Sequence, residues 1–196
     1  MKTSYIVLIV IFALIFIGGC STVGTYNSMV NKEEGVKTAW SQVENVYQRR
    51  ADLIPNLVEI VKGYAAHEQG TFTAVIEARA KATSVTIDPS KITPEQLKQF
   101  NEAQNGLSGA LSKLMVVVEQ YPNLKANENF MALQSQLEGT ENRIAVERKR
   151  FNEAAQGYNT YIRRFPANIF AGMFGFQSKA YFEAEEGANK APKIKF

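Results

Sequence analysis

The sequence has very few residues that bind metals or carry redox chemistry. It contains one Cys and one His among 196 residues, so it can form neither an internal disulfide nor a zinc site built from Cys and His. The sequence also lacks a large excess of one charge sign, because 22 Lys and Arg residues are nearly balanced by 19 Asp and Glu residues. The small net charge of +3 is not typical of a nucleic-acid groove. We therefore expect no metal, no cofactor and no nucleic-acid partner.

Catalytic motifs are missing as well. The sequence has no Gly-x-Ser-x-Gly, no phosphate-binding loop and no dinucleotide-binding glycine pattern. A Ser-His-Asp set would have to use His67, and a ferritin-like metal site needs two Glu-x-x-His elements, which do not occur. His67 is more typical of a surface His at a helix end. We predict that the protein is not an enzyme and assign no catalytic residue.

The N-terminus carries a targeting signal. An uninterrupted apolar run, Tyr5 to Ile17, follows Lys2. As a helix it would span about 20 Å, less than the roughly 30 Å hydrocarbon core of a bilayer, which favours the apolar region of a signal peptide. The residues Ile17-Gly18-Gly19-Cys20 resemble a bacterial lipobox, which makes Cys20 the lipidation candidate. The alternative is an uncleaved single-span anchor that extends past Gly19.

Either form of the N-terminus tethers the chain to a membrane. Because Lys2 precedes the apolar run, the positive-inside rule places the remaining chain outside the cytoplasm, in the bacterial cell envelope. We divide the chain into a signal peptide or anchor (1–19), a linker (20–25), a helical bundle (26–186) and a flexible tail (187–196).

The bundle prediction depends on apolar periodicity. Apolar residues recur in steps of three and four from Val36 to Tyr64, which predicts a first helix from Tyr26 to His67, kinked but not ended by Pro55. A second helix ends near Ser84, and a loop covers 85–92. No segment alternates like a strand.

Two further helices have clear start signals. Thr93-Pro94-Glu95-Gln96 combines a cap, a Pro and a capping-box Gln, and this helix ends at Pro122. Asn127 caps the last helix, which Pro166 ends. We predict an all-α fold, an antiparallel bundle of four long helical segments, in which the second and third together span the length of the first.

Charged residues within the apolar stripes are the candidate site. Arg50 lies between Tyr47 and Ile54, and Glu141 lies in the stripe of the last helix. A charge that faces a helical core needs an opposite partner. We predict a structural network that joins Arg49 or Arg50 to Glu141. Its expected neighbours are Asp52, Asn142 and Arg143. The alternative is a polar pocket for a peptide or an anionic ligand.

The segment after Pro166 is dense in large apolar residues and is interrupted by Gly172 and Gly175. It can fold back over one end of the bundle, or lie against a membrane or a partner protein. We expect it to fold back.

The ordered motifs of the chain resemble those of the LemA family. The matching residues are Tyr26-Asn27, Ala39-Trp40-Ser41-Gln42-Val43, Arg49 to Val58, Lys62-Gly63-Tyr64, His67-Glu68, Tyr121 to Asn127, Thr140 to Ile144 and Phe165-Pro166-Ala167-Asn168. The resemblance implies a membrane-anchored bacterial helical bundle with no catalytic residues to carry over. The Gly19-Cys20 ending departs from the single span of many members toward a lipoprotein.

These observations predict a non-enzymatic, membrane-anchored envelope protein that acts as a scaffold or adaptor for another envelope protein. One alternative is a sensing module that binds a ligand or peptide at the polar cluster. The other is an accessory factor of a membrane protease or a cell-wall hydrolase.

Overall fold

The computed structural model describes residues 2–183, except the side chains of residues 2–4, 10 and 13–21. This part of the chain is helical and contains no strand. Its helices are α1 (Lys2–Tyr64), α2 (Gln69–Ser84), α3 (Pro94–Val118), α4 (Pro122–Lys125), α5 (Glu128–Arg163) and α6 (Ala167–Phe174). The predicted all-α class is confirmed.

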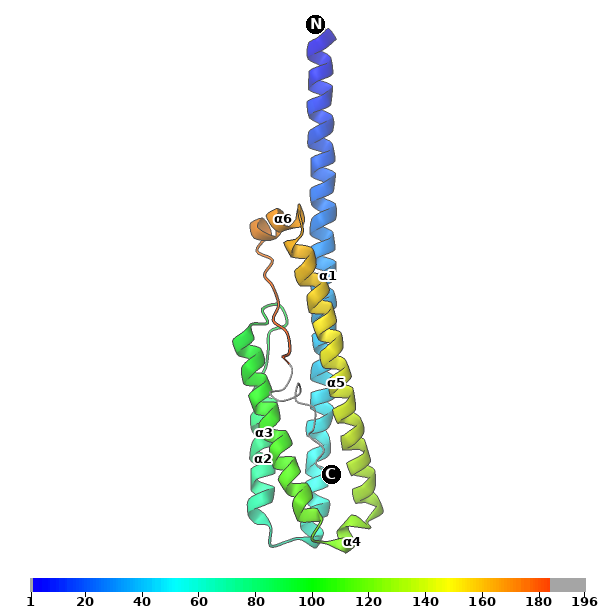
Figure 1. Cartoon of the computed structure of the whole chain (residues 1–196), viewed down its shortest axis with the longest axis vertical. Helices are drawn as coiled ribbons and strands as arrows, with labels where there is room; N and C mark the ends of the chain where they lie inside the picture. Colours follow the sequence, from blue (N-terminus) through cyan, green and yellow to red (C-terminus); the bar gives the residue numbers. More distant parts are fainter. Residues whose placement is uncertain (1, 184–196) are drawn as a thin grey trace, which may run out of the picture.

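Two antiparallel helix pairs form an elongated bundle (Figure 1). α1 and α5 pack along each other in opposite directions, while α2 and α3 form a shorter pair that lies beside the half of α1 farther from the N-terminus. The long antiparallel helices were predicted. The prediction that the second and third helices together span the first was wrong, because the loop between them reverses the chain and places them side by side.

Helix α1 begins far before the predicted start at Tyr26. Its N-terminal part projects beyond the rest of the bundle (Figure 1). Residues 20–25, expected to be a linker, continue the helix; they contain no Pro, and the Ser28 hydroxyl donates to the Gly24 carbonyl within it at 2.9 Å. Within the described residues we find no helix that combines the length and the apolar character needed to cross a bilayer.

Helix boundaries elsewhere follow the sequence signals. The Thr93 hydroxyl accepts from the Gln96 N–H at 3.2 Å, and the Gln96 side chain accepts from the Thr93 N–H at 3.1 Å, so the capping box is confirmed. The Asn127 side chain accepts from the Phe130 N–H at 3.0 Å. Pro122, expected only to end a helix, begins the short α4, because Pro is well suited to a first helical position.

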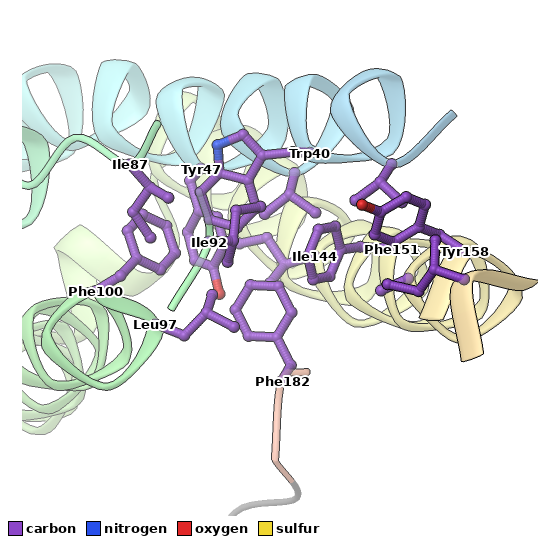
Figure 2. Packing of buried hydrophobic residues seen from close by; sticks show 14 of the residues in the cluster. Trp40, Tyr47, Ile87, Ile92, Leu97, Phe100, Ile144, Phe151, Tyr158 and Phe182 are labelled. Carbon is purple, nitrogen blue, oxygen red and sulfur yellow. The ribbon is translucent and has the colours of Figure 1, made fainter. Parts of the chain in front are cut away.

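The half of the bundle nearest α6 is filled by apolar side chains from α1, α3, α5 and residues 176–183. Trp40 is its centre, with ring centroids of Phe100 at 5.4 Å, Phe151 at 5.5 Å and Phe182 at 5.9 Å. Figure 2 shows Phe182 entering this cluster from a segment that is not helical. A second cluster, built around Leu114 and neighbouring residues of α1 and α2, fills the other half.

The segment after Pro166 folds back over the end of the bundle, as predicted, but as a helix that was not predicted. Helix α6 has eight residues and ends at Gly175, whose φ of 75° is left-handed. Residues 176–183, named here the C-terminal segment, then run back along the bundle (Figure 1). The predicted flexible tail, 187–196, lies outside the described residues.

Candidate functional site

The candidate polar cluster is organised around Arg50 of α1. This side chain is only 2% exposed, because its position on the helix faces α3 and α5. One terminal nitrogen of its guanidinium donates to Glu141 Oε1 at 2.7 Å and to Ser108 Oγ at 3.1 Å. The other donates to Gln104 Oε1 at 2.5 Å. The Arg50 Nε has no acceptor among the described residues.

The cluster holds four helices together. Gln104 of α3 accepts a hydrogen bond from Arg50 of α1. Its side-chain nitrogen also donates to the Ala82 carbonyl at 3.2 Å, so Gln104 links α1 to α2. Glu141 adds α5. Burial raises the pKa of the nearby Tyr47 phenol, and the positive charges of Arg148 and Arg50 oppose the rise. The arrangement therefore fixes the register of the helices and keeps a charge compensated inside the bundle.

The structure brings together only part of the predicted cluster. Arg50 and Glu141 form the expected ion pair, with the Glu141 side chain 45% exposed at its outer edge. The other predicted members, Arg49, Asp52, Asn142 and Arg143, are exposed and do not join it. Each α-helical step turns the chain by about 100°, so residues one or two positions from the stripe point away from the core.

Two members of the cluster were missed by sequence reasoning. Gln104 and Ser108 lie one helical turn apart on α3, on the face that meets Arg50. Gln104 is a buried polar residue within the apolar stripe of its helix, and this is the signal that could have identified it. Ser108 carries no such signal.

Pro55 creates a second polar contact between α1 and α2. The Ala51 carbonyl would accept from the N–H of residue 55 in a regular helix, and Pro has no N–H. The Arg79 Nε of α2 donates to this carbonyl at 2.7 Å. A Pro within a long helix thus supplies the acceptor that positions the neighbouring helix.

Two Asn side chains of α5 hold the C-terminal segment by its main chain. Asn159 accepts from the Lys179 N–H and donates to the Lys179 carbonyl, both at 2.8 Å. Asn152 does the same with Phe182, accepting at 2.8 Å and donating at 2.9 Å. Each amide therefore satisfies both backbone groups of one residue. This pairing fixes an extended chain without any need for a partner strand.

Two side chains of the segment enter the bundle. The buried Lys179 ammonium donates to Glu33 Oε1 of α1 at 2.7 Å and to the Ser90 carbonyl of the loop between α2 and α3. It also lies 5.4 Å from the ring centroid of Tyr158, whose pKa burial raises well above its usual value. Phe182 fills the aromatic cluster, and the Arg148 guanidinium lies 4.6 Å above its ring.

The two remaining candidate residues from the sequence, Cys20 and His67, lie outside the polar cluster. Cys20 lies within α1, and its side chain is outside the described ones. His67 lies in the short turn between α1 and α2. Among the side chains that the structure describes, no group of three or more from His, Cys, Asp or Glu could hold a metal ion.

Comparison with known proteins identifies the family. The LemA family matches residues 39–196. The chain is 31% identical over 186 residues to magnetosome protein MamQ 1 of Paramagnetospirillum magneticum. This match covers 86% of this chain and 68% of the relative. It is 25% identical over 164 residues to protein LemA of Metamycoplasma hominis, with 84% and 71% covered. Together with the antiparallel helical bundle, these matches show that the chain belongs to the LemA family.

Proposed function

We propose that this protein is a non-enzymatic scaffold of the bacterial cell envelope, tethered to a membrane by its N-terminus. The observation that carries the proposal is the continuity of α1. One helix continues from the apolar run, Tyr5 to Ile17, through Cys20 to the core of the bundle, so in either form no flexible linker would separate the tether from the bundle (Figure 1). An uninterrupted helix transmits position and orientation far better than a flexible linker does.

The polar interior supports a structural rather than a catalytic role. Both terminal nitrogens of Arg50 bond to acceptors of the same chain, and Glu141 supplies the compensating charge. A group held in this way stabilises helix register, and binding a ligand there would first require these bonds to break. The scaffold therefore uses its sides, not this cluster, to contact another envelope protein.

Mass spectrometry of the protein extracted from membranes tests the tether. A mature N-terminus at Cys20 that carries a diacylglyceryl group supports the lipoprotein form, and a Cys20→Ala chain is the matched control that should lack the modification. An intact Met1 on membrane-bound protein would favour the uncleaved anchor instead. Protein found only in the soluble fraction would contradict both forms.

Site-specific photo-crosslinking in intact cells tests the scaffold. Exposed apolar positions on α5, such as Met131 and Val146, are suitable sites for a photoreactive residue. A single envelope protein captured repeatedly from these positions, but not from positions on the opposite side of the bundle, supports the scaffold. Turnover of a substrate by the purified protein, abolished by a substitution that leaves the fold intact, would refute the non-enzymatic role.

A second candidate function is binding of an extended peptide. The groove that holds the C-terminal segment supports it, because Asn152 and Asn159 bond to the main chain while the buried sites of Lys179 and Phe182 select the side chains. A labelled peptide with the sequence of residues 176–183 should then bind a full-length chain whose own segment is weakened by Lys179→Glu and Phe182→Asp, and a peptide with the same two substitutions should not. Absence of binding by the first peptide would exclude this function.

A further inference from the structure

Helix α6 has its large and small apolar residues on unexpected sides. The small residues Ala167 and Ala171 face the bundle and are buried. Ile169 is 51% exposed and Met173 is 72% exposed on the outer side. A helix on the surface of a protein surrounded only by water normally buries its large apolar residues. Phe170 is partly buried against the core, but the exposed Ile169 and Met173 are typical of a surface that has another apolar environment outside it.

A larger apolar surface surrounds this helix. Phe165, just before α6, is 82% exposed, and Phe174 at its end is 49% exposed. Within α6, Ile169 and Met173 are four residues apart, the spacing that places side chains along one helical face. We name Phe165, Ile169, Met173 and Phe174 the end surface.

Helix α6, which carries most of the end surface, lies where α1 leaves the bundle (Figure 1). The Tyr26 ring of α1 contacts Phe174 at 5.0 Å and Phe176 at 5.7 Å between centroids, which places α6 at the level of Tyr26. With a helical rise of 1.5 Å per residue, Cys20 lies about 9 Å further along α1 and Ile17 about 13 Å. The headgroup layer of one leaflet is roughly 5–7 Å thick. A tether at either position therefore brings the end surface close to the headgroups.

The charges around the end surface fit an anionic lipid surface. The sequence contains no Asp or Glu from Arg163 to Phe182, and residues 3–31 contain no charged residue at all. Arg163 and Arg164 are exposed directly beside α6. Lys32 of α1 lines the same surface pocket as Arg164 and adds a third cation, whereas Lys179 is bonded to Glu33 inside the bundle. The two Arg side chains are therefore available to lipid phosphates, and the nearest carboxylate that shares a pocket with Arg164 is Glu153, about three helical turns back along α5.

We propose that the end surface is a second membrane contact, at which α6 inserts Phe165, Ile169 and Met173 among lipid headgroups. The inference rests on the proposed tether, because the tether brings α6 to the bilayer. This contact restricts the tilt of the bundle. A helix attached to a membrane at one point can tilt freely, whereas a helix with a second contact to one side is held at a defined angle. The side of the scaffold is then presented to its partner in a fixed orientation.

Tryptophan fluorescence in vesicles tests this contact. The full-length chain carrying Met173→Trp is reconstituted into vesicles of phosphatidylcholine and phosphatidylglycerol at about three to one, with and without bromine atoms on the upper acyl chains. A full-length chain carrying Val116→Trp is the matched control, because Val116 is also exposed and lies at the opposite end of the bundle. Trp40 is buried in both proteins and gives the same background.

We expect the Met173→Trp protein to show a blue-shifted emission in vesicles and a loss of emission with brominated lipid, and the Val116→Trp protein to show neither. If the protein floats with the vesicles but brominated lipid does not quench Met173→Trp, the tether stands and the contact is refuted. A blue shift that grows with the protein-to-lipid ratio and is not accompanied by quenching from brominated lipid would mean that a second copy covers the surface, which also refutes the contact. A chain that does not float with vesicles overturns both the tether and the contact.

Discussion

The contact between Arg79 and the Ala51 carbonyl depends on Pro55, and this dependence can be measured. Hydrogen bonds from a charged donor contribute about 1.5–3 kcal/mol, and this one is 2.7 Å long and partly buried. Arg79→Met keeps most of the aliphatic stem and removes the donor. Because the Ala51 carbonyl then has no partner within its own helix, we expect the free energy of unfolding to fall by about 2 kcal/mol.

The same substitution should cost much less when residue 55 has an N–H. In a Pro55→Ala chain the new backbone N–H can bond to the Ala51 carbonyl, so Arg79 is no longer its only donor. A double-mutant cycle of the four chains, unfolded in urea and followed by circular dichroism, isolates this coupling from the change in helix propensity. We expect a coupling energy of about 1 kcal/mol or more. Costs that add within about 0.3 kcal/mol would show that Pro55 and Arg79 act independently.

Three further perturbations test the other contacts. Glu141→Leu leaves the buried Arg50 without its counter-charge and should lower the free energy of unfolding, measured in urea, by about 2 kcal/mol. The control, Arg143→Leu on the exposed side of α5, should change it by less than about 0.5 kcal/mol. Equal effects would contradict the conclusion that Glu141 compensates the charge of Arg50. Asn159→Leu should accelerate hydrogen exchange in the C-terminal segment but not in α1, and unchanged exchange in the segment would show that the amide does not hold it. Burial raises the pKa of Tyr158 above its unfolded value near 10. Its contribution is thus fully present below about pH 10 and is lost as the pH rises further; Tyr158→Phe should therefore reduce the alkaline loss of stability measured in urea, and an identical alkaline loss would contradict its burial.

Helix starts were predictable because their signals are local. Thr93 and Gln96 form the expected capping box, and Asn127 caps α5, since each cap involves residues within one turn. The long continuation of α1 before Tyr26 was not predicted. Single Gly residues and small polar residues weaken a helix only slightly, and they do not end it where nothing competes for the backbone.

The candidate site was predictable only where a charge interrupted an apolar stripe. Arg50 and Glu141 were identified because a buried charge requires a partner, and each lies in a stripe. Arg49, Asn142 and Arg143 were included through sequence proximity, which does not correspond to spatial proximity on a helix. Partners such as Ser108 come from a third helix, and the stripe pattern of one helix does not specify how its neighbours are rotated against it.

The binding of the C-terminal segment shows which longer-range signal the sequence does contain. Asn152 and Asn159 are seven residues apart, which is about 10.5 Å along an α-helix. The residues they hold, Lys179 and Phe182, are three apart, which is about 9 Å and one full turn of a polyproline II-type extended chain, so that both can face the same helix. Because these two lengths are similar, amides one heptad apart on a helix can each satisfy the backbone of every third residue in an extended segment beside it. The pattern to search for in a sequence is therefore an Asn pair seven residues apart on a helix, followed by a non-helical segment in which two large side chains are three residues apart. The Asn pair alone, or the two side chains alone, would not be informative.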